Sequence, residues 1–208
     1  MNRMQTFLFS NPITHQWSGL SQFQVVEGGR DSFAVYNMNG GFTGINIQRP
    51  PRFQLFGSAP FFLVVQGQVL FTFKSKRMFP RIWKRKWVVY AGAKVDKSAQ
   101  VMELRKKSFH WFHPEFDVRF YSKAGKLMPA TWRVKSTELF TKRKFEIREA
   151  KNKKAVLGKV SCPLISFREA VTDLQAYKVS IHSPQLHPFI AMIISAMWDE
   201  QYLDRRGN

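Results

Sequence analysis

Short apolar runs separated by turn residues fill most of the chain between residues 32 and 182. In the segment Phe116–Phe120, Phe and Val alternate with Asp and Arg. A period of two is typical of antiparallel strands that place one face on a core and the other toward solvent. Two of the runs, Ser32–Tyr36 and Phe42–Ile47, flank an Asn/Gly segment, which indicates a hairpin.

The strands that this pattern predicts follow one another at intervals of about 8–12 residues. In chain order they are Ser32–Tyr36, Phe42–Ile47, Arg52–Gly57, Phe61–Val65, Val69–Lys74, Trp87–Gly92, Gln100–Arg105, Glu115–Ser122, Ala130–Ser136, Lys144–Ala150, Ala155–Ser161 and Ala176–His182. So many short strands at regular spacing favour a closed barrel or a sandwich.

One helix is predicted after the strands. Pro188 suits a first helical position, and Phe189–Trp198 follows without a charged residue, Gly or Pro. Because apolar residues cover every side of this helix, it should be buried all round. Its length of about 15 Å is half a bilayer core but fits the inside of a barrel. The sequence therefore predicts a mostly β fold, a closed antiparallel barrel that encloses its C-terminal helix.

The first 31 residues are predicted to form a partly ordered N-terminal arm, and residues 32–208 a single barrel domain. Met1–Gln24 contains no acid and a single base, Arg3, and it lacks the charged and apolar regions of a secretory signal. Mitochondrial transit peptides carry several arginines, so import into mitochondria is an alternative with little support. No apolar run is long enough to span a bilayer.

The charge of the chain is strongly positive, with 33 Lys+Arg against 14 Asp+Glu among 208 residues and a formal net charge of +19. Most of the excess lies in residues 74–107 and 123–159. Charge concentrated in this way attracts polyanions: nucleic acid, an anionic membrane or an acidic protein. The one cysteine, Cys162, cannot form an internal disulfide, which favours a reducing, cytoplasmic location with possible attachment at a membrane surface.

Three segments resemble the LURP-one-related family, which is akin to Tubby domains and phospholipid scramblases. Val35–Gly41 is similar to the family's strand and Tyr-Asp-x-x-Gly turn. Val69–Lys76 followed by Lys84–Gly92 resembles its Leu-Phe-Thr hairpin and Trp-x-Val-Tyr-x-Gly strand, and Ala176–Ile181 before Pro188–Glu200 resembles its last strand and helix. Asn37 replaces the acidic residue of the first turn. The resemblance covers about residues 32–203.

This resemblance implies a barrel of about twelve strands around a central helix. It implies much less about activity: Tubby domains bind phosphoinositides, scramblases act on membranes, and many LURP-one-like members have no settled biochemical role. A Tubby phosphoinositide motif has no residue-by-residue match in this chain, and a fold does not by itself fix a function.

The candidate binding site is a basic hairpin with apolar residues at its tip. Between Lys74 and Lys86 there are seven positive charges and no acid. The residues expected to bind are Lys74, Lys76, Arg77, Phe79, Arg81, Trp83, Lys84, Arg85 and Lys86. Each base near an anionic bilayer gains about 1 kcal/mol, and aromatic residues favour the headgroup level. Single-stranded nucleic acid would also suit this composition, with a base stacked on Trp83. A solvated loop without a ligand is the third reading.

A second basic set follows at Lys142, Arg143 and Lys144, with more lysines in the next turn, at Lys151, Lys153 and Lys154. Whether these residues lie at the same end of the barrel as the first set is left open by the sequence. Lys142, Arg143 and Lys144 are included in the predicted site.

Catalytic and metal chemistry find little support in the sequence. His110 and His113 would point to opposite faces of a strand, so neither a metal nor a cofactor is expected there. Cys162 has no motif of a nucleophile around it. We therefore expect a non-enzymatic module that binds anionic lipids of the phosphoinositide type. The alternatives are a structural protein that binds RNA or ribonucleoprotein, and a scaffold with an acidic protein partner.

Overall fold

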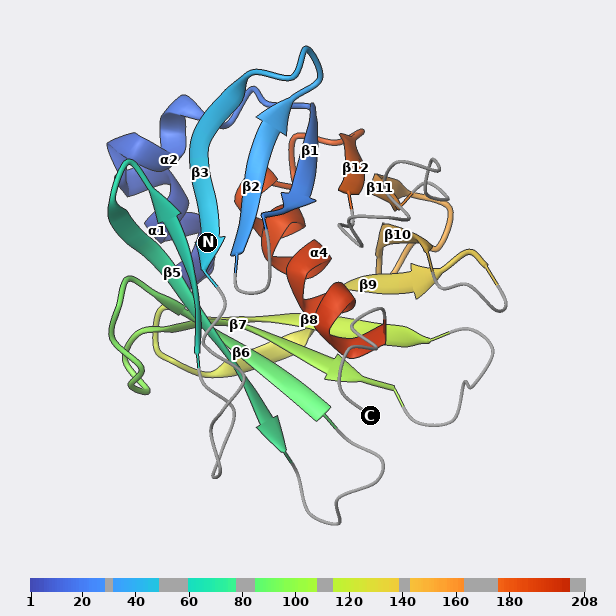
Figure 1. Ribbon diagram of the computed structural model, residues 1–208. Helices are drawn as coiled ribbons and strands as arrows, with labels where there is room; N and C mark the ends of the chain where they lie inside the picture. The colour runs from blue at the N-terminus through green and yellow to red at the C-terminus, as the bar shows by residue number, and fades with distance from the viewer. Residues whose placement is uncertain are drawn as a thin grey trace.

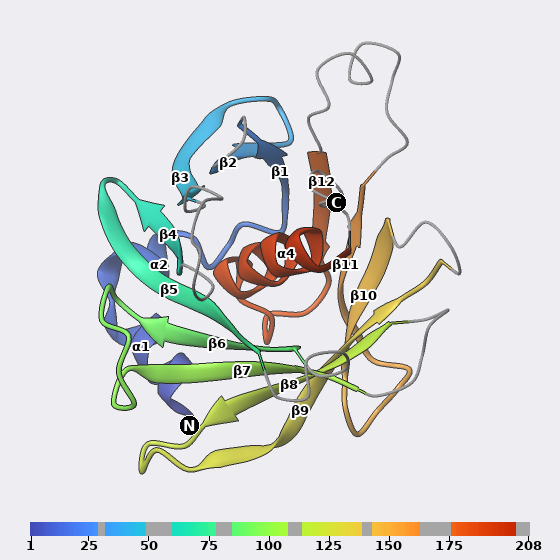
Figure 2. The ribbon, with the colours of Figure 1, turned by 60° about the horizontal axis from the view of Figure 1, so that its bottom comes forward.

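The computed structural model describes residues 1–28, 32–48, 60–77, 85–107, 114–138, 143–162 and 176–202. Its strands form one closed antiparallel barrel in the order β1-β12-β11-β10-β9-β8-β7-β6-β5-β4-β3-β2. Helix α4 (Pro188–Tyr202) runs through the middle of the barrel, while α1 (Arg3–Ser10) and α2 (Pro12–Gln16) lie outside the ring of strands (Figures 1 and 2). The predicted fold class is confirmed.

The strand bounds agree with the apolar runs of the sequence at most positions. They are β1 Gln22–Glu27, β2 Ser32–Asn37, β3 Phe42–Gln48, β4 Phe61–Val65, β5 Gln68–Arg77, β6 Arg85–Ala91, β7 Gln100–Lys106, β8 Glu115–Tyr121, β9 Leu127–Ser136, β10 Lys144–Glu149, β11 Val156–Ser161 and β12 Ala176–Ile181. The strand predicted at Arg52–Gly57 lies outside the described residues.

Helix α4 fills the interior, as its composition predicts. All its side chains from Pro188 to Asp199 are buried. Inward-facing aromatic residues of the wall pack on it: the ring centroid of Trp198 lies 4.5 Å from that of Phe145 and 5.8 Å from that of Phe116. Asp199 is the first charged residue of α4, and it accepts a hydrogen bond from the buried hydroxyl of Tyr177.

The barrel begins earlier than the predicted boundary at residue 32. Strand β1 pairs with β2 on one side and with β12 on the other, so it closes the ring. Phe23 and Val25 are fully buried, and the intervening positions face outward. The arm predicted for residues 1–31 thus contains a barrel strand as well as α1 and α2.

The two N-terminal helices cap one end of the barrel. Met4 and Leu8 of α1 join the hydrophobic core, and the ring of Phe7 packs edge-on against Phe71, with centroids 5.0 Å apart. The Arg3 side chain donates hydrogen bonds to backbone carbonyls of the β6–β7 and β8–β9 turns. Gly125 leaves room for this guanidinium, since a Cβ there would lie 2.8 Å from an Arg3 nitrogen.

Consecutive strands are antiparallel all the way round, so their connections alternate between two ends. We call one the capped end; it carries the turns 38–41, 66–67, 92–99, 122–126 and 150–155, and α1 lies against it. The opposite end, where β5 ends at Arg77, β9 ends at Ser136 and β10 begins at Lys144, is called the far end. This alternation decides which basic segments can act together.

His187 joins the N-terminal arm to the start of α4. Its Nδ1 accepts the N–H of Phe189 at 3.3 Å, and its Nε2 donates to the carbonyl of Thr14 at 3.2 Å. Burial, with a smaller contribution from the nearby His15, lowers the pKa of His187 to about 4, although the bond to Thr14 opposes the shift. A proton on Nδ1 would remove the acceptor for Phe189 and place a positive charge at a helix N-terminus.

We expect acidification to destabilise the fold through His187. Its pKa is about 6.5 in an unfolded chain and about 4 in the folded protein, so the unfolded state binds more protons between these values. Stability is therefore full above pH 6.5 and falls as the pH drops toward 4, by up to about 3 kcal/mol. Thermal unfolding of wild type and His187→Asn across this range measures the difference, and parallel curves for the two proteins would refute the assignment.

Candidate functional site

The strand register of β5, β6 and β7 sets basic residues directly opposite one another. Lys76 lies opposite Lys86, Arg77 lies opposite Arg85, and Lys86 lies opposite Arg105 on the next strand. Like charges in such positions destabilise a sheet, because opposed residues have Cβ atoms only about 5 Å apart. Acidic neighbours offset part of this repulsion, because Glu103 pairs with Lys86 and Asp117 lies opposite Arg105 on β8.

The positive charge continues around the far end over neighbouring strands. Because the connections alternate, the ends of β5 and β6 share this end with the start of β10, where Arg143 and Lys144 lie. Basic residues on the strand ends between these two sets were missed in the sequence, namely Arg105, Lys106, Lys107 and Lys135. We call these strand ends, from β5 to β10, the basic rim. Lys151, Lys153 and Lys154 lie in the β10–β11 turn, at the capped end.

Several cations of the basic rim are held by carboxylates. The ammonium group of Lys86 lies 3.1 Å from Glu103, whose side chain is only 4% exposed, and that of Lys107 lies 3.4 Å from Glu115. Glu138 lies 3.1 Å from the ammonium group of Lys144. Its other oxygen accepts the backbone N–H of Arg143. These pairs fix the positions of the charges and reduce the net field at the rim.

Below the rim, the outer wall carries a network of ion pairs. Arg133 lies 3.5 Å from both Glu115 and Asp117. Glu146 pairs with Arg148 and Lys159. Burial works to raise the pKa of Glu146, but hydrogen bonds and charge from these two cations outweigh it and leave that pKa below its usual value. Arg133, Arg148 and Lys159 on this wall are thus each compensated by at least one carboxylate.

The predicted site residues divide into three groups. Lys74, Lys86, Arg143 and Lys144 are described with their side chains, and Lys74 and Lys86 are partly exposed. Lys76, Arg77 and Arg85 occupy strand positions at the far end. The remaining predictions lie outside the described residues: Phe79, Arg81, Trp83, Lys84 and Lys142.

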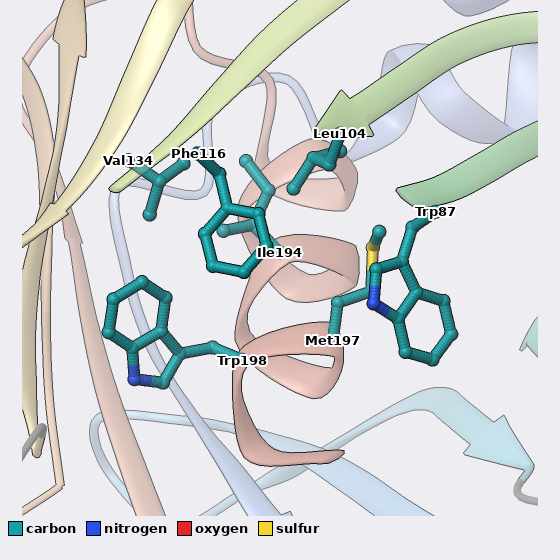
Figure 3. Close-up of a pocket in the computed structure, with 7 residues that line it drawn as sticks. All are labelled: Trp87, Leu104, Phe116, Val134, Ile194, Met197 and Trp198. Atoms are coloured by element: carbon teal, nitrogen blue, oxygen red, sulfur yellow. The ribbon is translucent and has the colours of Figure 1, made fainter. Parts of the chain in front are cut away.

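The interior offers no comparable site in the part of the chain that is described. A cavity of about 10 Å³ lies between α4 and strands β6–β9, roughly the space of one water molecule. Figure 3 shows its lining residues, Trp87, Leu104, Phe116, Val134, Ile194, Met197 and Trp198. Cys162 is buried, and no cluster of three or more metal-ligating residues occurs among the described side chains. His110 and His113 lie outside them.

The outer surface is hollowed where β9 ends. This hollow has a volume of about 240 Å³ and is lined by Lys135, Ser136, Thr137 and Arg148. Lys135 is exposed, while Arg148 is held by Glu146 and by the carbonyl of Lys153. The Ser136 hydroxyl is buried and donates to the carbonyl of Glu138, so Lys135 and Thr137 are the exposed side chains of this hollow.

Comparison with known proteins gives one result that covers most of the chain. A family model described as LURP-one-related matches residues 25–199, from the first barrel strand to Asp199 of α4. No curated protein matches the chain. Among the described helices, none is both long and apolar enough to cross a bilayer.

Because Lys86 pairs with Glu103, we expect substitutions of two lysines in the same hairpin, Lys86 and Lys74, to affect the free energy of unfolding differently. Lys86→Ala leaves a buried carboxylate without its 3.1 Å partner and should lower the free energy of unfolding by about 1–3 kcal/mol. Lys74→Ala breaks no ion pair among the described residues and should leave stability near wild type. Denaturant unfolding measures both. Recovery of stability in Lys86→Ala/Glu103→Gln would support the pairing, and equal stability of the two single variants would contradict it.

Proposed function

The chain belongs to the LURP-one-related family, and from that premise we propose that its barrel is a non-enzymatic module that binds anionic membrane surfaces. The binding site would be the basic rim at the far end, with lipid phosphates of the phosphoinositide type as ligands. No cofactor takes part in this function.

The observation that carries the proposal is the opposition of like charges across β5, β6 and β7. Lys76, Lys86 and Arg105 occupy one line across the three strands. An unfavourable pair costs up to about 1 kcal/mol in the free protein, and less where an acidic neighbour such as Glu103 offsets the repulsion. Phosphate groups lying between these cations would attract them and reduce their mutual repulsion. The arrangement would therefore stabilise the lipid-bound protein more than the free protein.

A bilayer fits this surface better than a compact ligand does. The basic rim extends over six neighbouring strands, and the interior cavity is too small for a headgroup. Near an anionic bilayer each base contributes about 1 kcal/mol, so several moderate attractions add up without a deep pocket. In the sequence, Phe79 and Trp83 stand between the two halves of the hairpin, where aromatic side chains would favour the headgroup level.

Vesicle binding at physiological salt tests the proposal directly. Purified protein would be sedimented with neutral vesicles, with phosphoinositide vesicles and with a single-stranded RNA of matched charge as competitor. Preference for the phosphoinositide vesicles supports the module as proposed. Tighter binding to RNA would mean that the basic rim is a nucleic-acid-binding surface. Equally weak binding to vesicles and RNA would point to an acidic protein partner.

We predict that Lys76→Glu weakens vesicle binding by about 30-fold, because one favourable charge is lost and one unfavourable charge is gained. Its stability should stay the same or rise by up to about 1 kcal/mol, since the new glutamate lies opposite Lys86. Vesicle sedimentation and thermal unfolding measure the two effects.

Lys178→Glu is the matched control. It makes the same change of charge at an exposed position of β12, on a part of the wall outside the basic rim. Its binding should remain close to wild type. Equal losses in Lys76→Glu and Lys178→Glu would mean that net charge alone drives binding and would remove the basic rim from the proposal.

A further inference from the structure

The capped end carries a second basic surface that the proposed function does not use. Four exposed lysines stand on two turns: Lys94 and Lys97 in the β6–β7 turn, and Lys123 and Lys126 in the β8–β9 turn. We call these four lysines together with Arg3 the Arg3 cluster. It lies at the opposite end of the same strands that form the basic rim.

Arg3 ties the two turns together. Its Nη1 donates to the carbonyl of Ser98 at 2.9 Å and to that of Lys97 at 3.3 Å, while its Nε donates to the carbonyl of Lys123 at 3.3 Å. These acceptors are neutral carbonyls, so the guanidinium charge is not cancelled. Arg3 thus holds two turns together that carry four lysines, although the five positive charges repel one another.

The lysines of the Arg3 cluster differ from those of the wall in their pairing. Among the described residues, none of the four ammonium groups lies in an ion pair. The single carboxylate in the β6–β7 turn, Asp96, accepts hydrogen bonds from the Ser98 hydroxyl and the Ala99 N–H, and Lys94 adds a smaller electrostatic attraction to it. Val95, at the same turn, is 46% exposed. Mobile ammonium groups beside an exposed apolar side chain suit the surface of an anionic bilayer.

The two basic surfaces lie at opposite ends of the barrel. Strands β7 and β8 join the two ends, and each has seven residues, so the ends are separated by about 23 Å. Charges interact over about 8 Å at physiological ionic strength. Each end therefore senses only the surface that faces it.

From this separation we propose that the protein bridges two anionic bilayers, one at the basic rim and one at the Arg3 cluster. This inference rests on the proposed function, because it needs the far end to bind a membrane. It adds that the capped end binds a second membrane of similar charge. The barrel between them, filled by α4, would act as a rigid spacer.

Vesicle clustering tests the bridge. Wild-type protein is mixed with phosphatidylcholine vesicles that contain phosphatidylserine, and particle size is followed by light scattering. A single supported bilayer of the same composition reports binding alone. We expect Lys94→Gln/Lys126→Gln to bind the supported bilayer as wild type does but to need about 30-fold more protein for clustering, at about 1 kcal/mol for each lysine.

The control is Lys178→Gln, which removes an exposed charge from the wall without breaking an ion pair among the described residues and should cluster vesicles as wild type does. If Lys94→Gln/Lys126→Gln clusters vesicles at the same protein concentration as wild type, the bridge is overturned. Such a result would be expected if dimers of the protein joined the vesicles through their basic rims. Wild-type protein that binds the supported bilayer without clustering vesicles would also overturn it, while the proposed function would stand. Absence of binding to the supported bilayer would refute both.

Discussion

The burial of one apolar helix inside a closed sheet is the interaction on which the rest of this structure depends. Between Phe189 and Met197, helix α4 is apolar on nearly every side, so a wall of strands must surround it. The wall can close only if β1 pairs with β12, and closure leaves none of the twelve described strands with an edge open to another chain. Because the interior is then full, binding is left to the two ends and the outer wall.

Charged residues are arranged differently at the ends of the barrel and on its outer wall. On the wall, cross-strand neighbours of opposite sign lie close together, as Arg133 does with Glu115 and Asp117. At the strand ends the register brings like charges together, and at the capped end Arg3 holds two lysine-bearing turns in place. Among the described residues, basic side chains thus gather at both ends of the barrel. A polarised distribution of this kind favours oriented contact with extended anionic surfaces.

Much of the fold could be predicted because its determinants are local. Alternation marked most strands, and the absence of polar residues in Phe189–Trp198 indicated a helix inside a barrel. The prediction places β1 in the N-terminal arm, although Phe23 and Val25 carry the alternation that marks a strand. The site was harder to predict, because the end at which a loop lies depends on how many strands precede it. Partners such as Glu103 for Lys86 depend on the register of distant segments.

The seam between β1 and β12 also governs how the protein can be made. Gln22 pairs with Ser180, so the ring closes only after a segment more than 150 residues downstream is available. The core cannot be completed until α4 is available, and α4 follows β12 in the chain. Until both segments have left the ribosome, the apolar inner face of the wall is exposed and its edges are unpaired. Contacts between such distant segments make folding slow and vulnerable to aggregation, so synthesis of this barrel should depend on chaperones that shield the unfinished wall.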